Sequence, residues 1–108
     1  MNPKISISKY QACLLGGAIG DALGAPAEFL SAEQIQTRYG HRGITGYVEF
    51  PDGKGMFTDD TQMTLFTAEG LLRSGHGQKN IPGNLNVKAY ESYQRWLYTQ
   101  DLPFNPEQ

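Results

Sequence analysis

The chain has 108 residues, a formal net charge of −2 and a single cysteine. Its length suits one domain, and a hydrophobic fraction of 39% with 19% charged residues excludes wholesale disorder. Nucleic-acid binding needs a basic surface, which 9 Lys and Arg residues against 11 Asp and Glu residues do not supply. The lone cysteine excludes an internal disulfide framework and a cysteine-based zinc site, which fits a reducing compartment.

No stretch of the sequence reaches the roughly 18 apolar residues that are needed to span a bilayer. The apolar run 12–20 has the length of a short signal-peptide core, but it contains three glycines and meets Asp21 where such a core would continue. We therefore expect a cytoplasmic protein that binds neither membranes nor nucleic acid.

Glycine is the unusual component, because nine of the 13 glycines lie between Gly16 and Gly55. A first helix is predicted from about Ser8 to Gly24, and Pro26 predicts that it stops at Ala25. Small residues recur on one face of this helix at four-residue spacing: Ala12, Gly16, Gly20 and Gly24. Each glycine costs about 1 kcal/mol relative to alanine inside a helix. The ridge therefore indicates either close packing of another helix, the favoured interpretation, or a ligand against exposed backbone.

Three further helices are predicted. Ser31 and Gln34 form a capping-box pattern at the start of a short helix that ends at Gly40. A glycine-rich loop follows from 41 to 57, with a strand-like turn around 51–53. The third helix begins near Thr58 and ends before Gly75, and the fourth runs from about 87 to 100.

The fourth helix carries a stripe that we expect to form core: Ala89, Tyr90, Tyr93, Trp96 and Leu97. Lys88, Glu91, Ser92 and Arg95 are expected on its polar side. Cys13 is expected to be buried as a small hydrophobe. Because no stretch alternates with period two for long enough to build a sheet, the predicted fold class is all-α.

The run Thr58, Asp59, Asp60, Thr61 at the start of the third helix has two interpretations. Thr58 suits an N-cap, and the two aspartates suit the positive end of the helix dipole. The same four residues also form a dense cluster of the oxygen ligands that Mg²⁺ prefers. Taken alone, the run favours the capping interpretation.

Other motif patterns are absent from the sequence. The glycine-rich helix fits neither a dinucleotide-binding fingerprint nor a P-loop, and 52–55 lacks the spaced carboxylates of an EF-hand loop. His41 and His76 each stand alone in glycine-rich segments, and we expect both to be exposed to solvent.

Two segments taken together resemble the ADP-ribosylglycohydrolase family, whose members are similar to dinitrogenase-reductase-activating glycohydrolase. They are Gly-Asp-Ala-Leu-Gly-Ala-Pro-Ala-Glu-Phe at 20–29 and Phe-Thr-Asp-Asp-Thr-Gln-Met-Thr-Leu at 57–65. The resemblance covers roughly Tyr10 to Gln100. It implies an all-helical hydrolase with a binuclear Mg²⁺ or Mn²⁺ centre that removes ADP-ribose from a modified side chain, such as arginine, of a protein or from a small ADP-ribosyl compound.

The resemblance also implies roles for particular residues. The Thr-Asp-Asp ligands of the family fall on Thr58, Asp59 and Asp60. The glutamate after the glycine-rich helix, a ligand or a residue that gates the substrate, falls on Glu28. Asp60 or Glu28 would then act as the general base, since hydrolysis of an N-glycosidic bond needs an activated water. Gly20 and Asp21 match the signature helix, where packing and support beside the bound substrate are expected.

The sequence departs from the family in one respect. A second acidic cluster of the form Asp-x-Asp-Ser/Thr is expected from a C-terminal part, and nothing after Asp60 matches it. We therefore expect residues 1–108 to form a partial, N-terminal portion of the glycohydrolase domain, with the missing part as a partner. The alternatives are a non-catalytic helical binding module or an inactive truncated product of the same family.

Overall fold

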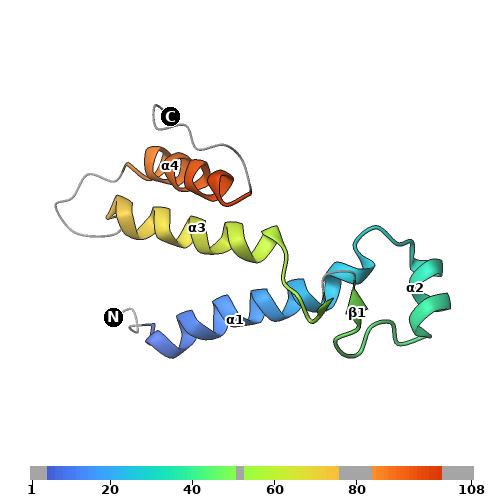
Figure 1. Ribbon diagram of the computed structural model, residues 1–108. Helices are drawn as coiled ribbons and strands as arrows, with labels where there is room; N and C mark the ends of the chain where they lie inside the picture. Colours follow the sequence, from blue (N-terminus) through green and yellow to red (C-terminus); the bar gives the residue numbers. More distant parts are fainter. Residues whose placement is uncertain (1–4, 51–52, 76–83, 101–108) are drawn as a thin grey trace. The chain divides into compact units, whose positions relative to one another are not determined.

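A computed structural model describes residues 5–50, 53–75 and 84–100 (Figure 1). The chain divides into two compact units, Met1–Thr61 and Gln62–Gln108. The first unit contains α1 (Ile7–Gly24), the 3-10 turn η1 (Ala25–Ala27), α2 (Ala32–Tyr39), β1 (Glu49–Phe50) and β2 (Gly53–Lys54). Helix α3 (Asp59–Ser74) begins in the first unit and continues in the second, which also contains α4 (Leu85–Tyr98). The all-α prediction is confirmed, with one short strand pair added to it.

Helix α1 ends at Gly24 as predicted, but the reason given for its end is wrong. Ala25 keeps helical angles (φ −51°, ψ −42°), and the backbone continues as η1 instead of turning away. Pro26 lies in the first turn of η1, where its missing N–H leaves no hydrogen bond unmade. The steric restriction on a residue before proline therefore yields to a helical turn here.

Helix α2 confirms the predicted capping box. The Gln34 N–H donates to the Ser31 hydroxyl at 3.2 Å, and the Ser31 N–H donates to Oε1 of Gln34 at 2.8 Å. Gly40 follows the helix with a φ of 85°, a conformation that is inexpensive for glycine alone.

The loop after α2 contains a small antiparallel hairpin. Glu49 pairs with Lys54 and Phe50 pairs with Gly53. The turn was predicted around 51–53, and positions 51 and 52 of it lie outside the described residues. The hairpin brings the chain back toward α3.

Helices α3 and α4 begin and end within two residues of their predicted bounds. Gly75 follows α3 with a φ of 65°, the left-handed conformation expected of a C-terminal cap. Helix α4 starts at Leu85 and ends at Tyr98, two residues earlier at each end than predicted.

The backbones of α3 and α4 come close together at Gly70 and Ala89. A Cβ atom on Gly70 would lie 3.1 Å from the Cα atom of Ala89. Ser92, expected on the polar side of α4, is fully buried, and its hydroxyl has no hydrogen-bond partner among the residues that the structure describes. Tyr90 was expected in the core and is 65% exposed. Ala89 lies on the predicted stripe, so the prediction is wrong at Ser92 and Tyr90 and not for the whole face.

Several hydrogen bonds and ion pairs join α3 to α4 in the second unit. The indole N–H of Trp96 donates to Oε1 of Gln62 at 3.0 Å, and the hydroxyls of Thr67 and Tyr93 lie 2.6 Å apart. Glu91 pairs with Arg73 of α3 and with Lys88 of its own helix. The Lys88 and Arg73 charges hold the pKa of Glu91 below its ordinary value, the Lys88 hydrogen bond contributing most.

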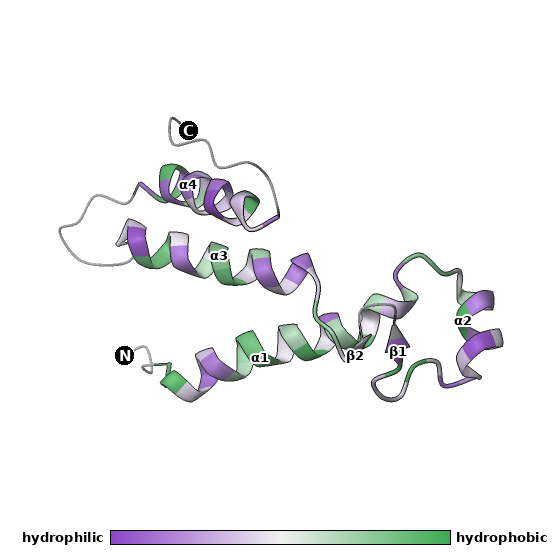
Figure 2. Ribbon diagram, in the orientation of Figure 1, coloured by the Kyte–Doolittle hydropathy of each residue, from purple (hydrophilic) through white to green (hydrophobic). Residues whose placement is uncertain are grey.

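Little apolar surface is buried within the described residues. Ala22 is the one hydrophobic residue among them that is buried, whereas Ile7 is 76% exposed and Leu15 is 62% exposed. Figure 2 shows hydrophobic positions along much of α1. Cys13, predicted to be buried, is exposed on the same helix. In the described ranges no single helix is long and apolar enough to cross a membrane, and the bent stretch Ile7–Tyr39 meets that test only with its two helices combined.

Candidate functional site

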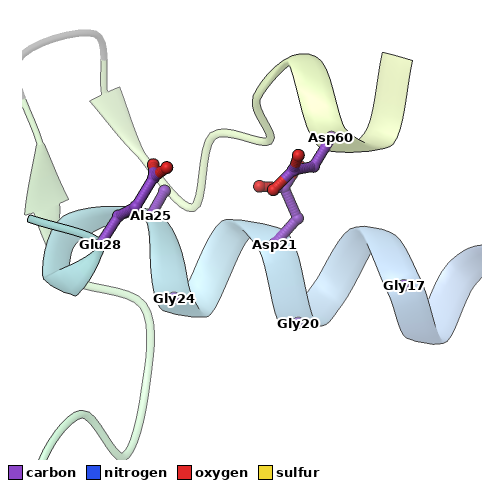
Figure 3. A pocket seen from close by; sticks show the side chains of 7 residues that line it. All are labelled: Gly17, Gly20, Asp21, Gly24, Ala25, Glu28 and Asp60. Atoms are coloured by element: carbon purple, nitrogen blue, oxygen red, sulfur yellow. The ribbon is translucent and has the colours of Figure 1, made fainter. Parts of the chain in front are cut away.

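One face of α1 and the start of α3 line an open pocket of about 390 Å³ within the first unit. Figure 3 shows the residues that line it: Gly17, Gly20, Asp21, Gly24, Ala25, Glu28 and Asp60. The first six recur at intervals of three, one, three, one and three residues, which places them on one face of a helical stretch. Asp60 faces them from the first turn of α3 (Figure 3).

The glycines of α1 leave parts of the helix backbone bare on its side of the pocket. A Cβ atom on Gly16, Gly17, Gly20 or Gly24 would meet no atom within 4 Å beyond its own stretch of helix. Within the described residues of the first unit, no other helix packs against these glycines. Three of these glycines instead line the pocket: Gly17, Gly20 and Gly24.

Asp21 joins α1 to the start of α3 through four hydrogen bonds. Its Oδ1 accepts from the Thr58 hydroxyl at 2.7 Å. Its Oδ2 accepts from the Thr58 N–H at 2.7 Å, from the Thr61 N–H at 3.2 Å and from the Thr61 hydroxyl at 2.6 Å. Charged acceptors make the stronger hydrogen bonds, so this carboxylate determines where α3 begins.

The same contacts shift the titration of Asp21. Partial burial raises the pKa of this carboxyl, but the hydrogen bonds from Thr58 and Thr61 outweigh it and bring the pKa below the ordinary value of 3.8. Asp21 is therefore a carboxylate at neutral pH, next to the positive end of the α3 dipole.

Thr58 confirms the capping interpretation of the acidic run. It directly precedes α3, and its hydroxyl accepts a hydrogen bond from the Asp60 N–H at 3.2 Å. Asp59 and Asp60 occupy the first turn of the helix. Capping does not exclude a binding role, because the hydroxyl oxygen keeps one further acceptor position.

The loop that leads into Thr58 is held by a glycine and a tyrosine. Gly55 has a φ of 69°, and a Cβ atom on it would lie 3.1 Å from the ring of Tyr47. A larger residue would be strained and would displace the ring. The glycine-rich loop predicted before the third helix thus has a defined path close to the site.

The predicted site residues are only partly brought together. Gly20, Asp21, Glu28 and Asp60 line the pocket, and Figure 3 shows the Asp21 and Asp60 carboxylates extending into the space between their helices. Thr58 contacts this group through Asp21, while Asp59 is exposed and is not among the lining residues. Nothing in the geometry tests the individual roles predicted for these six residues.

Sequence reasoning missed two classes of residue at the site. Gly17 and Ala25 line the pocket, and their helical spacing from Gly20 and Asp21 was a signal that could have found them. Thr61 binds Asp21 across forty positions of the chain, and no local pattern predicts such a contact.

The donor atoms at the pocket are of the type that a hard divalent cation binds, but there are few of them. They are carboxylate and hydroxyl oxygens, which Mg²⁺ and Mn²⁺ prefer. Within the described residues, no three His, Cys, Asp or Glu side chains form a group that could hold a metal ion. A cation at this site would therefore need further ligands from outside these residues.

Comparison with known proteins agrees with the motifs in this pocket. The chain is 44% identical over 62 residues to an ADP-ribosyl-[dinitrogen reductase] glycohydrolase of Rhodospirillum rubrum, covering 56% of this chain and 21% of that protein. It is 36% identical over 70 residues to an ADP-ribosylarginine hydrolase of Serratia proteamaculans, covering 65% and 18%. An uncharacterized protein of Archaeoglobus fulgidus is 41% identical over 69 residues, covering 61% and 22%.

The chain thus spans about a fifth of the length of the curated relatives that it matches. No solved structure shows significant similarity to it. The family model described as ADP-ribosylglycohydrolase matches residues 2–108, nearly every residue of the sequence. The chain belongs to the ADP-ribosylglycohydrolase family.

Proposed function

We propose that this chain supplies part of the active site of a hydrolase that removes ADP-ribose from modified side chains, with arginine as the linked residue. The observation that carries the proposal is the pocket that Glu28 and Asp60 line together with Gly17, Gly20 and Gly24 of α1. Family membership supports the reaction class, and the name of the Serratia relative supports the arginine linkage.

The reaction is a hydrolysis of the N-glycosidic bond. A water oxygen bonds to the anomeric carbon of the ribose, the bond from that carbon to the guanidinium nitrogen breaks, and the nitrogen takes up a proton. The transition state gains oxocarbenium character. Asp60 or Glu28 would accept the proton of the water, since both carboxylates line the pocket. The bare backbone at Gly17, Gly20 and Gly24 leaves room for the ribose in the same pocket.

We further propose dependence on Mg²⁺ or Mn²⁺, with Thr58, Asp59, Asp60 and Glu28 among the ligands. Such a cation, when bound, supplies Lewis-acid polarisation of the ribose hydroxyls and of the attacking water. Oxygen donors of this kind support the proposal, and the family's remaining carboxylates would complete the set. The chain alone should bind the cation weakly, because few carboxylates face the pocket.

The activity is tested by completing the domain. In a chimera, this chain replaces the matching segment of the Rhodospirillum rubrum relative, and release of ADP-ribose from ADP-ribosylarginine is measured. We expect turnover, and we expect Asp60→Asn or Glu28→Gln to lower kcat at least about 100-fold, the lower end of general acid–base contributions. Glu33→Gln is the matched control, because Glu33 is an exposed carboxylate of α2 outside the pocket. A chimera with the helicity of the relative but no turnover would contradict the proposal.

The cation is tested by titrating the chain with Mn²⁺, followed by its paramagnetic effect on amide resonances. Line broadening should centre on Asp60 and Glu28. The double variant Asp59→Ala/Asp60→Ala should lose it, and Glu33→Gln should retain it. Equal broadening of the double variant and the unaltered chain would exclude these aspartates as ligands.

A non-catalytic binding module is the second candidate. The bare backbone at Gly17, Gly20 and Gly24 favours it, since such a surface suits a bound ligand as well as a reacting one. This candidate predicts that the chain binds free ADP-ribose in calorimetry, and that the chimera binds it without hydrolysing ADP-ribosylarginine. Turnover by the chimera would rule it out.

A further inference from the structure

Asp21 lies in the pocket, and its carboxylate is held by the protein. Thr58 and Thr61 donate to it through two N–H groups and two hydroxyls, at 2.6–3.2 Å. Oδ2 accepts three of these hydrogen bonds and Oδ1 accepts one. The acceptor positions of Oδ2 are therefore filled by the protein, whereas Oδ1 keeps one.

The four donors all belong to the end of α3 that carries the acidic pair. The N–H groups at a helix start have no partner within the helix. Asp21 satisfies those of Thr58 and Thr61, and Thr58 in turn caps the N–H of Asp60. A side chain of α1 thus performs, from 37 and 40 positions away, the capping that a local residue usually performs.

The engagement has a consequence for the Thr58 hydroxyl. Its proton is donated to Oδ1 of Asp21, so the oxygen presents lone pairs and not a proton to its other neighbours. One lone pair accepts from the Asp60 N–H, and the other remains an acceptor. Asp21 therefore orients the one hydroxyl that the proposed cation site would use.

Asp21 also places a negative charge at the N-terminus of α3. A helix N-terminus carries roughly half a positive charge, which repels a cation. The Asp21 carboxylate offsets that charge directly at the first turn of α3, beside Asp59 and Asp60. A neutral residue of the same shape would keep part of the hydrogen bonding and lose this compensation.

We propose that Asp21 is a positioning residue that fixes the first turn of α3, and through it Thr58 and Asp60, against the glycine face of α1. This inference rests on the proposed function for the relevance of Asp60 to catalysis. It gives the support expected of Asp21 from the family resemblance a specific form, namely its contacts with Thr58 and Thr61.

The test separates positioning from ligation with two readouts on the 108-residue chain: amide hydrogen exchange, and broadening by Mn²⁺. In Asp21→Ala, exchange at Thr58 and Thr61 should rise about tenfold or more, because each loses a charge-assisted bond. Asp21→Asn, which keeps a carbonyl acceptor, should fall between this variant and the unaltered chain. Glu33→Gln, a carboxylate lost from the first turn of α2, should change neither amide.

Asp60→Ala removes a proposed ligand and leaves Asp21 in place. In this variant Mn²⁺ broadening should disappear, while the amides of Thr58 and Thr61 should stay protected from exchange. If Asp21→Ala does not fold, Thr61→Val removes one donor, keeps the side-chain shape and should raise exchange at Thr61 alone. Unchanged exchange in the Asp21 variants with loss of Mn²⁺ broadening would overturn the proposal and make Asp21 a direct ligand. An unaltered chain without Mn²⁺ broadening would contradict the cation role, and the exchange rates would still decide the role of Asp21.

Discussion

The Thr61 hydroxyl lies 2.6 Å from Oδ2 of Asp21, although forty positions separate the two residues in the chain. This contact connects the two segments that carry the family's motifs, one in α1 and one at the start of α3. It also makes the geometry of the pocket dependent on a single carboxylate, which leads to a prediction about pH.

Acid should loosen the start of α3. The folded-state pKa of Asp21 is below 3.8, so the stability that its ionised form contributes is present above pH 3.8 and is lost as the pH falls through the lower, folded value. The amide exchange rates of Thr58 and Thr61 are corrected for the intrinsic pH dependence of exchange. The corrected rates should increase below pH 3.8 in the unaltered chain. In Asp21→Asn the same exchange rates should depend less steeply on pH. Equal pH dependence in the two proteins would show that the titration of Asp21 does not control the start of α3.

Two helical glycines should respond in opposite directions to alanine. Gly70→Ala places a Cβ atom 3.1 Å from the backbone of Ala89, which cannot move aside like a side chain, and overpacking of this kind costs about 1–3 kcal/mol. Gly16→Ala meets no atom within 4 Å, and removing a helical glycine should add about 1 kcal/mol. Urea unfolding followed by circular dichroism measures both, and equal effects would refute the close contact at Gly70.

The lone tryptophan reports on the second unit. Gln62→Ala leaves the Trp96 indole N–H without its acceptor and should lower the free energy of unfolding by about 0.5–1.5 kcal/mol. The measurement is Trp96 fluorescence during urea unfolding. Gln36 is an exposed glutamine of α2 in the first unit, so Gln36→Ala should not change the midpoint of this unfolding transition. A midpoint unaffected by Gln62→Ala would show that the indole bond contributes nothing.

The chain should unfold with low cooperativity. Ala22 is the one buried hydrophobic residue among those described, and the slope of unfolding free energy against denaturant follows the surface that unfolding exposes. We expect a urea m-value below about 1 kcal/mol per molar, the low end for small proteins. A compact helical domain of similar length serves as the reference, and an equal m-value would contradict the exposed apolar surface.

Local rules predicted the helices well. The capping box at Ser31 and Gln34, the N-cap at Thr58 and the glycines that follow α2 and α3 all act within a few residues, so their patterns are legible in the sequence. Pro26 shows the limit of such rules, because its effect on Ala25 was a preference that the 3-10 turn overrode.

Burial was less predictable because it depends on partners. The stripe of α4 predicted a largely aromatic core. Gly70 allows α3 to approach the backbone of α4 at Ala89, while Ser92 is buried and Tyr90 is 65% exposed. Cys13 is exposed for the same reason: an apolar helix face is buried only where another element covers it.

The sequence by itself determined the family and the local elements, since the motifs at 20–29 and 57–65 and the capping residues are contiguous. The tertiary structure alone decided that Asp21 caps α3, that the glycine ridge lines a pocket and that Glu28 faces the same pocket as Asp60. These relationships bring together residues more than thirty positions apart in the chain. Such contacts follow from how the chain folds back on itself, which no local preference of the backbone or spacing of residue types encodes.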